Sequence, residues 1–455
     1  VAVERHGVIA VAEAREEAEL PGTFVMDPKT RAFLPHAVTR NEDGTLSATP
    51  DPLGFFTSFC DGDHAVSFYG DNLPRYAGSV VKAMASAKDG FPSVVRLYER
   101  ALAALRPEDQ RAREEAWTSL TRLFDQELRA TVHEVNRLTP TIVEVIVHAP
   151  RAARGFQPGQ FYRLQNFETD AIVVEGTPLI TEGMALTGAW VDKERGLLST
   201  IVLEMGSSSR LCSTLKKGQP VVLMGPTGAP TEIPENENVV LAGGGLGNAV
   251  LFSIGRALRQ RGCKVVYFAG YRSPDDVFRP TDIEEAADMV VWSCDRAPAP
   301  AARRTGDVSF VGNIVEAMVA YAKGELATWE TPFKLREMDR IIVIGSDRMM
   351  SAVKEARKPG GSLFPHVSAK HVGVGSINSP MQCMMKEICA QCLQRQVDPV
   401  TGKASIVFTC FNQDQDLDKV DFPFLASRLR ASSAQEKLSR LWLDRLIQVG
   451  KVRHV

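Results

Sequence analysis

The sequence VVLAGGGLGNAV, residues 239–250, determines which fold we predict for the second half of this chain. Its first residues form the β-branched, apolar run of a buried strand, and the residues after the glycines begin a helix-like pattern. Four glycines lie between the two: Gly243, Gly244, Gly245 and Gly247. Without a Cβ, a phosphate can approach the backbone N–H groups, and a helix start adds partial positive charge. The order predicts a dinucleotide site, with a tight structural βα turn as the alternative.

The residues after the glycine turn alternate between strand-like and helix-like segments. KVVYFAGY (264–271) and DMVVWSCD (288–295) have the composition of strands, and residues 275–287 between them are expected to form a helix. Residues 306–324 and 339–361 continue the alternation. Strands that alternate with helices of this length predict a parallel, doubly wound sheet.

Upstream of the turn, residues 128–236 have a different pattern. Short β-branched runs, such as MALTGAWVD (184–192) and LLSTIVLEM (197–205), are separated by Gly, Pro and Asp. This pattern predicts a small antiparallel barrel. Residues 91–127 carry a helical apolar stripe with a break expected at Pro107, and residues 424–447 are expected to form one amphipathic helix.

The bulk composition narrows the functional classes. A chain of 455 residues is expected to hold about two to four domains. Its net charge of −2 gives no indication of nucleic-acid or anionic-membrane binding. No apolar run approaches the roughly 18–20 residues that span a bilayer, and no signal-peptide pattern is visible, so we expect a cytoplasmic protein. The sequence opens on Val1, and we expect either a processed chain or a piece of a longer one.

Several separated motifs resemble one protein family in the right order. They are PGQFYRLQ (158–165), MALTGAWVD, EMGSSSRLCSTLKKGQPVVLMGPTG (204–228), VVLAGGGLG, YFAGYRSPDDVF (267–278) and IIVIGSDRMMSAV (341–353). The chain resembles the ferredoxin–NADP reductase-like flavoenzymes over about residues 128–420. Within them it is similar to the branch with the electron-transfer subunit of NAD-dependent dihydroorotate dehydrogenase, the sulfhydrogenase γ subunit and the small subunit of electron-bifurcating transhydrogenase.

This resemblance implies roles for individual residues. The backbone at 185–189 would contact the flavin isoalloxazine and ribityl groups, which nominates Ala185, Leu186, Thr187 and Gly188. The FAD pyrophosphate would lie on Gly206, Ser207, Ser208 and Ser209. The NAD(P) pyrophosphate would face the four glycines of the turn, with Arg272 and Asp276 near its adenosine ribose. The nicotinamide arm would lie near Gly345, Ser346 and Asp347.

The chain departs from the family pattern at two places. Met184 stands where the flavin motif usually begins with arginine, so a phosphate-pairing guanidinium has to come from elsewhere. Arg163 and Arg210 are the candidates, with a solvated surface arginine as the alternative for each. The second departure is GSDRMM (345–350), which replaces the Cys-Gly-Pro that often precedes Met-Met.

Four of the eight cysteines lie close together as Cys383-x5-Cys389-x2-Cys392-x17-Cys410. Bunched thiolates repel one another, and a cation or an iron–sulfur core removes that repulsion. Structural zinc prefers two close cysteine pairs, whereas three near thiolates with a distant fourth are typical of a [2Fe–2S] cluster. The sequence therefore predicts a [2Fe–2S] cluster on these four residues, with zinc, another cluster or no metal as alternatives. The resembling proteins have a four-residue first gap and glycines where this chain has MMKEI.

The N-terminal segment FYGDNLPRYAGSVVKAMASAKDGF (68–91) resembles the last flavin-binding segment of the glutamate synthase small-subunit family. The resemblance implies that Asp71 and residues 78–81 face a flavin. The two Gly-x-Gly-x-x-Gly turns of that family are missing, so a longer chain or a partner would have to supply the remainder. A tight βα turn with no ligand is the alternative.

The combined prediction is an α/β-plus-β protein in five parts: an α-rich N-terminal extension (1–127), an FAD-binding β-barrel (128–236), an NAD(P)-binding α/β domain (237–372), a [2Fe–2S] segment (373–425) and a C-terminal helix (426–455). Electrons would pass between NAD(P)H and partner oxidoreductase subunits through FAD and the cluster, and no side chain is nominated as a catalytic acid or base.

Two alternatives stay open for the function: a self-sufficient NAD(P)H:ferredoxin or quinone reductase, and a non-catalytic assembly protein with zinc. Asp275 and Asp276 favour NADH, whereas Arg272 and Arg279 would suit the NADPH 2′-phosphate. We expect NADH. The terminal substrate, the partner and the direction of electron flow do not follow from the sequence.

Overall fold

The computed structural model divides the chain into two compact units, residues 1–119 and 120–455, which are described separately. The structure describes residues 8–10, 24–30, 32–326, 328, 330–377, 381 and 389–455, with the backbone alone for 8–10 and for residue 71. In this described part, none of the helices combines the length and the apolar character that crossing a bilayer requires.

The first unit contains a five-stranded sheet in the order β1-β5-β4-β2-β3. Its strands are β1 (Val8–Ala10), β2 (His36–Arg40), β3 (Leu46–Pro50), β4 (Phe56–Asp61) and β5 (His64–Ser67). The sequence prediction of an α-rich extension missed this sheet, because its strands have six residues or fewer and are separated by Asp, Gly and Pro. The helical stretch expected over 91–127 is present as the end of α2 (Val80–Leu97), α3 (Glu99–Ala103) and α4 (Gln110–Leu128), of which α4 continues past residue 119 into the second unit. A short 3-10 turn over Pro107–Asp109 makes the expected break.

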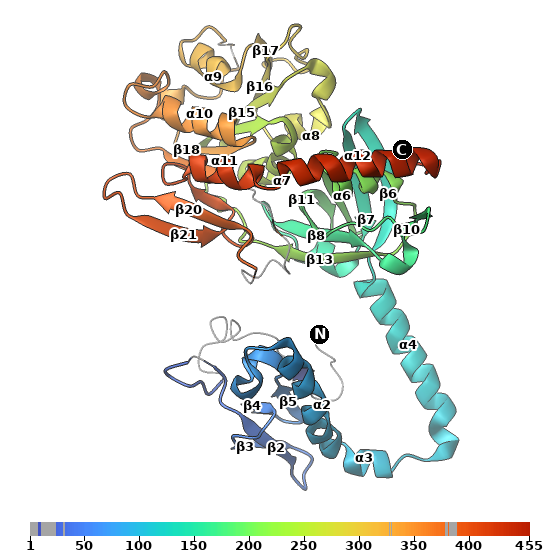
Figure 1. The fold of residues 1–455 in the computed structure, drawn as a ribbon. Helices are drawn as coiled ribbons and strands as arrows, with labels where there is room; N and C mark the ends of the chain where they lie inside the picture. The colour runs from blue at the N-terminus through green and yellow to red at the C-terminus, as the bar shows by residue number, and fades with distance from the viewer. Residues whose placement is uncertain are drawn as a thin grey trace. The chain divides into compact units, whose positions relative to one another are not determined.

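An antiparallel sheet occupies the first part of the second unit, in the order β13-β8-β11-β12-β7-β6 (Figure 1). Its strands are β6 (Thr131–Thr139), β7 (Ile142–His148), β8 (Phe161–Asn166), β11 (Met184–Asp192), β12 (Leu197–Leu203) and β13 (Val221–Thr227). The short elements around it are α5 (Pro150–Gly155), β9 (Val173–Val174), β10 (Thr177–Pro178) and α6 (Ser207–Leu211). Backbone hydrogen bonds join its two ends, with Val132 N donating to Gln219 O at 2.9 Å and Gly218 N to Val132 O at 2.7 Å. Its core contains Val143, Val145, Tyr162 and Leu198.

A seven-stranded sheet follows in the order β17-β16-β15-β14-β18-β19-β22. Its strands are β14 (Asn238–Gly244), β15 (Lys264–Tyr271), β16 (Met289–Cys294), β17 (Val308–Val311), β18 (Arg340–Ile344), β19 (Val372–Ser376) and β22 (Asp414–Asp416), and all neighbours are parallel except β19 and β22. The helices α7 (Asn248–Gln260) and α8 (Pro280–Glu285) pack on one face, and α9 (Ile314–Ala322) and α10 (Asp347–Arg357) on the other. Successive residues of each strand point to opposite faces of the sheet, so they are buried alternately against the α7–α8 layer and the α9–α10 layer. The predicted doubly wound sheet is therefore present.

Two predicted helices are divided in the structure. The helix expected at 275–287 is a 3-10 turn over Pro274–Asp276 followed by α8, because Arg279 adopts a left-handed φ of 48° and Pro280 starts a new helix. The helix expected at 424–447 is α11 (Phe422–Arg430) and α12 (Ser433–Val449), with a hairpin of β20 (Leu393–Val397) and β21 (Ala404–Phe408) before them.

The strand order reverses between β14 and β18, and the two sheets share a core close to this point. β14 has β15 on one side and β18 on the other, so the helices that follow β14 and β18 leave a crevice at the carboxyl ends of these strands. Ile142, Ala189 and Ile201 of the antiparallel sheet are buried in the same cluster as Leu251 and Phe252 of α7. One continuous apolar core therefore fixes the antiparallel sheet against the glycine turn.

Gly247→Ala is expected to lower the free energy of unfolding by about 1–3 kcal/mol. A Cβ at this position would lie 2.5 Å from the carbonyl oxygen of Ile344 and 3.0 Å from the backbone nitrogen of Gly345, neither of which can move without shifting β18. Gly345→Ala is the matched control, since its Cβ would meet chiefly the flexible end of Met349, at 2.8 Å. Urea denaturation of both variants checks this, and equal losses of stability would contradict it.

Candidate functional site

The glycine turn after β14 has a defined geometry that leaves one side open. Gly245 adopts a left-handed φ of 54°, and a Cβ built on it would have no neighbour within 4 Å. Asn248 holds the turn, because its Nδ2 donates to the Gly245 carbonyl at 2.9 Å and its Oδ1 accepts from the Tyr267 hydroxyl at 3.0 Å. A Cβ on Gly243 would collide with that Oδ1 at 2.1 Å. Gly243 is therefore required for packing, and Gly245 for backbone conformation beside open space.

The second predicted nucleotide segment meets this turn at the same edge of the sheet. A Cβ on Gly244 would lie 3.7 Å from the Cα of Gly345, so the two strand ends touch through glycine backbone. Ser346 caps α10 by accepting from Met349 N at 3.2 Å, and Asp347 is the first residue of that helix. The structure thus brings together the two glycine segments that the sequence predicted separately.

Arg272 and Asp276 lie just after β15, whose Gly270 pairs with Gly244 of β14, so they belong to the same edge. Arg272 is exposed. The Asp276 carboxylate accepts from Ser273 N at 3.1 Å and so stabilises its own turn. Arg272 is therefore exposed at this edge of the sheet, whereas Asp276 has a structural partner.

The predicted flavin strands β8 and β11 pair with Arg163 opposite Ala185 and Phe161 opposite Thr187. Because side chains alternate along a strand, these four share one face of the sheet. Met184 and Leu186 belong to the opposite face, which packs into the core of the antiparallel sheet. An arginine at 184 would therefore face that core and not the side of the sheet that carries Arg163.

Arg163 carries an unsatisfied buried donor. Its Nε is buried with no hydrogen-bond partner in the described part of the chain, and a Cβ on Gly183 would lie 2.0 Å from that atom. A terminal nitrogen stands 3.6 Å from the Met224 sulfur, which is a weak acceptor. An unpaired buried guanidinium nitrogen is costly, and an anionic ligand would relieve it. Of the two predicted arginines, Arg163 is the one whose surroundings fit a phosphate.

Arg210, the second candidate, is already paired. Its guanidinium contacts Glu204 at 3.1 Å and Asp444 at 3.4 Å, and Arg137 contacts Glu204 at 2.6 Å. Burial acts to raise the pKa of Glu204, but the hydrogen bond and charge of Arg137, with Arg210, outweigh burial and lower this pKa below its usual value. The guanidinium of Arg210 therefore serves an internal ion-pair network.

The predicted phosphate turn is a single short loop at the start of α6. Gly206 precedes the helix, and its N–H donates to the Ser209 hydroxyl at 3.0 Å. Ser208 accepts from Glu182 N at 3.0 Å, and Ser207 is the first helical residue. Two of the three predicted serine hydroxyls are therefore used to hold the loop.

Two of the four clustered cysteines lie together against the flavin strands. Cys392 and Cys410 are buried in one cluster with Phe161 and Met381, and Ala185 packs on it. Cys389 is exposed, and Cys383 falls outside the residues that the structure describes. Among the described residues, no group of three or more His, Cys, Asp or Glu side chains could hold a metal ion. The cluster therefore stays a prediction.

The segment after Cys410 is attached to the antiparallel sheet by buried polar bonds. The Thr231 hydroxyl donates to Asp414 at 2.6 Å, and Gln413 Nε2 donates to the Gly159 carbonyl at 3.2 Å. Burial raises the pKa of Asp414, and the hydroxyls of Thr231 and Ser376 oppose that rise. These contacts hold Cys410 beside β8.

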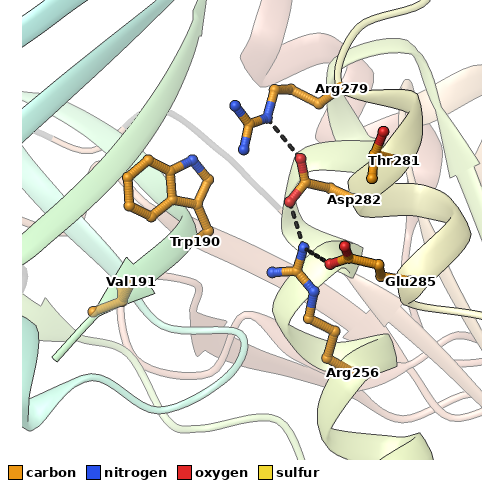
Figure 2. A pocket seen from close by; sticks show the side chains of 7 residues that line it. All are labelled: Trp190, Val191, Arg256, Arg279, Thr281, Asp282 and Glu285. Atoms are coloured by element: carbon orange, nitrogen blue, oxygen red, sulfur yellow. Dashed lines mark hydrogen bonds and ion pairs between the residues drawn. The ribbon is translucent and has the colours of Figure 1, made fainter. Parts of the chain in front are cut away.

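A polar cluster that the sequence analysis did not identify joins the antiparallel sheet to α8 (Figure 2). The carboxylate of Glu144, 1% exposed, accepts from Trp190 Nε1 at 2.8 Å and Ser199 Oγ at 2.6 Å. Arg279 lies 5.8 Å from the Trp190 ring centroid, 3.8 Å from Glu144 and 2.6 Å from Asp282. A lone glutamate in the apolar run IVEVIV (142–147) was the available signal. Arg279 therefore already has two carboxylate partners and an aromatic ring in this cluster.

The N-terminal flavin-like segment keeps the predicted order of strand, turn and helix. Asp71 lies in a 3-10 turn, Gly70–Asn72, after β5, and α2 begins at Val80. Gly78 has a φ of 86° with open space around its Cβ position. This order does not distinguish a flavin-binding segment from a structural turn, and the role of Asp71 stays a prediction.

Comparisons with known proteins add a family to this geometry. No family model matches the chain. An uncharacterized protein of Rickettsia prowazekii is 32% identical to this chain over 82% of its residues. The match covers only 41% of that longer relative, so this chain spans less than half of its length. The dihydroorotate dehydrogenase B (NAD(+)) electron transfer subunit homolog of Thermotoga maritima is 25% identical over 67% of this chain and 91% of its own length.

Among solved structures, the NADH-dependent reduced ferredoxin-NADP oxidoreductase matches with a TM-score of 0.54 and 24% identity, over 69% of this chain and 96% of that one. The fold is thus that of the ferredoxin–NADP reductase-like proteins, an α/β flavin- and nucleotide-binding fold. These matches bear out the predicted resemblance to the ferredoxin–NADP reductase-like flavoproteins, within the branch that includes the dihydroorotate dehydrogenase electron-transfer subunits.

Arg279→Met is expected to lower the free energy of unfolding by about 1–3 kcal/mol, because it removes the cation that faces the buried Glu144 carboxylate. Combining it with Glu144→Gln should cost less than the sum of the two single changes, by about 0.5 kcal/mol or more. Urea denaturation in a double-mutant cycle measures this coupling. Arg296→Met, at an exposed position, is the control, and strict additivity would contradict the coupling.

Proposed function

We propose that the chain is an electron-transfer module that passes electrons between NADH and a partner oxidoreductase subunit through FAD and a [2Fe–2S] cluster. The supporting observation is a juxtaposition. The glycine turn after β14 meets Gly345 at the strand-order reversal, beside the sheet whose β8 and β11 carry Arg163 and pack on Cys392 and Cys410. A nucleotide, a flavin and a cluster would thus have adjoining places in one unit.

The nucleotide would lie along the carboxyl ends of β14, β15 and β18. The open side of Gly245 lets a pyrophosphate approach the backbone, and the start of α7 adds the partial positive charge of a helix N-terminus. NADH is favoured over NADPH, because Arg279 is paired with Asp282 and the loop after β15 carries Asp275 and Asp276.

The flavin would lie on the face of β8 and β11 that carries Arg163, Ala185 and Thr187, so the antiparallel sheet would be the flavin-binding barrel. Arg163 would hold a phosphate oxygen through its unpaired Nε, in place of the family arginine that Met184 replaces. Flavin chemistry couples a two-electron hydride donor to one-electron carriers. The protein would contribute binding and orientation, and no side chain is assigned a proton transfer.

The cluster would be held by Cys383, Cys389, Cys392 and Cys410, close to the flavin face through Phe161 and Ala185. The relatives named as electron-transfer subunits support a partner subunit as the recipient or source of electrons. The terminal substrate would then belong to that partner.

Absorption spectra of the purified chain with added FAD test the flavin site. We expect flavin bands that bleach with NADH at lower concentrations than with NADPH. Arg163→Met should weaken FAD binding by roughly tenfold or more, the cost of a lost charge-assisted hydrogen bond. Arg195→Met, whose side chain is 68% exposed, is the control. Unchanged FAD affinity in the Arg163 variant would contradict its role, and no flavin binding in any variant would contradict the proposed function.

Metal analysis and low-temperature EPR test the cluster. About two irons per chain and a signal on reduction by NADH are expected. Cys383→Ser, Cys392→Ser and Cys410→Ser should each lose iron, while the half-buried Cys60→Ser in the first unit should keep it. One zinc and no iron would refute the cluster. Rapid turnover of the chain alone with a natural one-electron acceptor would favour a self-sufficient reductase instead.

A further inference from the structure

The C-terminal helix α12 lies against the predicted flavin-phosphate turn (Figure 1). Its Leu443, Leu446 and Ile447 are buried in a cluster with Leu211 of α6 and Val174 of β9. This helix follows the segment that carries Cys392 and Cys410. The apolar contacts fix which of its side chains face α6.

One acidic side chain of α12 lies directly at Gly206. A Cβ built on Gly206 would be 2.5 Å from Oε2 of Glu436. Gly206 is the first residue of the turn on which the FAD pyrophosphate is expected. The carboxylate therefore occupies space beside the backbone that a phosphate would have to approach, and it carries the same sign of charge.

A second acidic side chain of α12 competes for the cation of this turn. Asp444 lies 3.4 Å from Arg210 Nε, while Glu204 holds the other side of the same guanidinium at 3.1 Å. Arg210 is thereby neutralised from two sides, and a phosphate would have to displace one of these carboxylates. The interaction of Asp444 with Arg210 is thus in direct competition with the expected ligand.

Space for part of a ligand exists next to these groups. A hollow of about 680 Å³ lies between α12 and Thr141, lined by Glu204, Arg210 and Asp444 among others. Its size is in the range of small-molecule and cofactor sites. Neither Gly206 nor Glu436 lines this hollow, which also has Arg440 and Lys451 on its walls, so the room lies on the Arg210 and Asp444 side of the turn.

We propose that Glu436 and Asp444 of α12 determine the affinity of the chain for FAD, because they must leave Gly206 and Arg210 before the pyrophosphate can bind. This inference rests on the proposed function, since it takes FAD as the ligand of the 206–209 turn. FAD binding would then loosen the α6-facing side of α12, and removing either negative charge would tighten FAD binding.

The test is FAD titration of the full chain by flavin fluorescence, with Glu436→Gln, Asp444→Asn and the double variant. Each single change is expected to lower the Kd for FAD by roughly fivefold, and the double change by about tenfold or more. Glu436→Lys should lower it further than Glu436→Gln, and the differences should shrink at high salt. Glu194→Gln removes the same charge from an exposed turn and is the control.

Hydrogen exchange of α12 supplies an independent readout. FAD should increase the exchange of α12 amides in the wild-type chain, because the helix loosens, whereas a helix that merely packs would be unchanged or protected. Because Glu436 is exposed and Asp444 half-buried, folding of the variants is not at risk.

The outcomes separate the two proposals. Tight, stoichiometric FAD binding that none of the α12 variants alters would overturn the role of Glu436 and Asp444 and leave the proposed function standing. Absence of FAD binding in the wild type and in every variant would overturn both. Tighter binding in the variants with the control unchanged supports both.

Discussion

The close approach of the ends of β14 and β18 is the constraint on which the nucleotide half depends. Gly244 and Gly345 touch through their backbones, and Gly247 lies against the Ile344 carbonyl. A Cβ on Gly247 would push against the backbone at the end of β18, whereas a Cβ on Gly244 or Gly345 would meet chiefly the flexible end of Met349. Gly245 is different, since it has free space and needs only its left-handed backbone. Three glycines therefore build the crevice, and a fourth leaves it open to a ligand.

The antiparallel sheet is held in register with this crevice by the shared core. Ala189 and Ile201 are buried with Phe252 of α7, and the Glu144–Arg279 pair adds a polar contact at the edge. A buried carboxylate with two hydrogen bonds and a facing guanidinium contributes little net stability, but it penalises any slippage that unpairs it. The contact between the antiparallel sheet and the parallel-sheet domain therefore combines two kinds of interaction. Apolar packing tolerates small shifts, whereas the polar cluster of Glu144 and Arg279 does not.

Periodicity and glycine spacing were enough to predict the parallel sheet, because a buried strand and an amphipathic helix repeat with different periods. The short strands of residues 36–67 were missed, since runs of four to six residues between Gly and Pro carry little periodic signal. The pairing of Arg163 with Ala185 could not be predicted either, because register depends on contacts between distant segments. The same holds for Glu436 at Gly206, which are 230 residues apart in the chain.

The positions of the charged side chains explain why the missing arginine at Met184 does not by itself argue against a phosphate site in this sheet. Position 184 faces the core of its sheet, so arginine there would bury a charge, and the unpaired guanidinium stands instead on the other face, at Arg163. Arg210, the other predicted arginine, is enclosed by Glu204 and Asp444. Arg163 is thus left with an unpaired Nε, while Arg210 is paired with carboxylates of the chain itself. In the proposed FAD complex, a phosphate oxygen would gain a partner at Arg163 Nε, whereas Arg210 would first have to be released by Glu204 or Asp444.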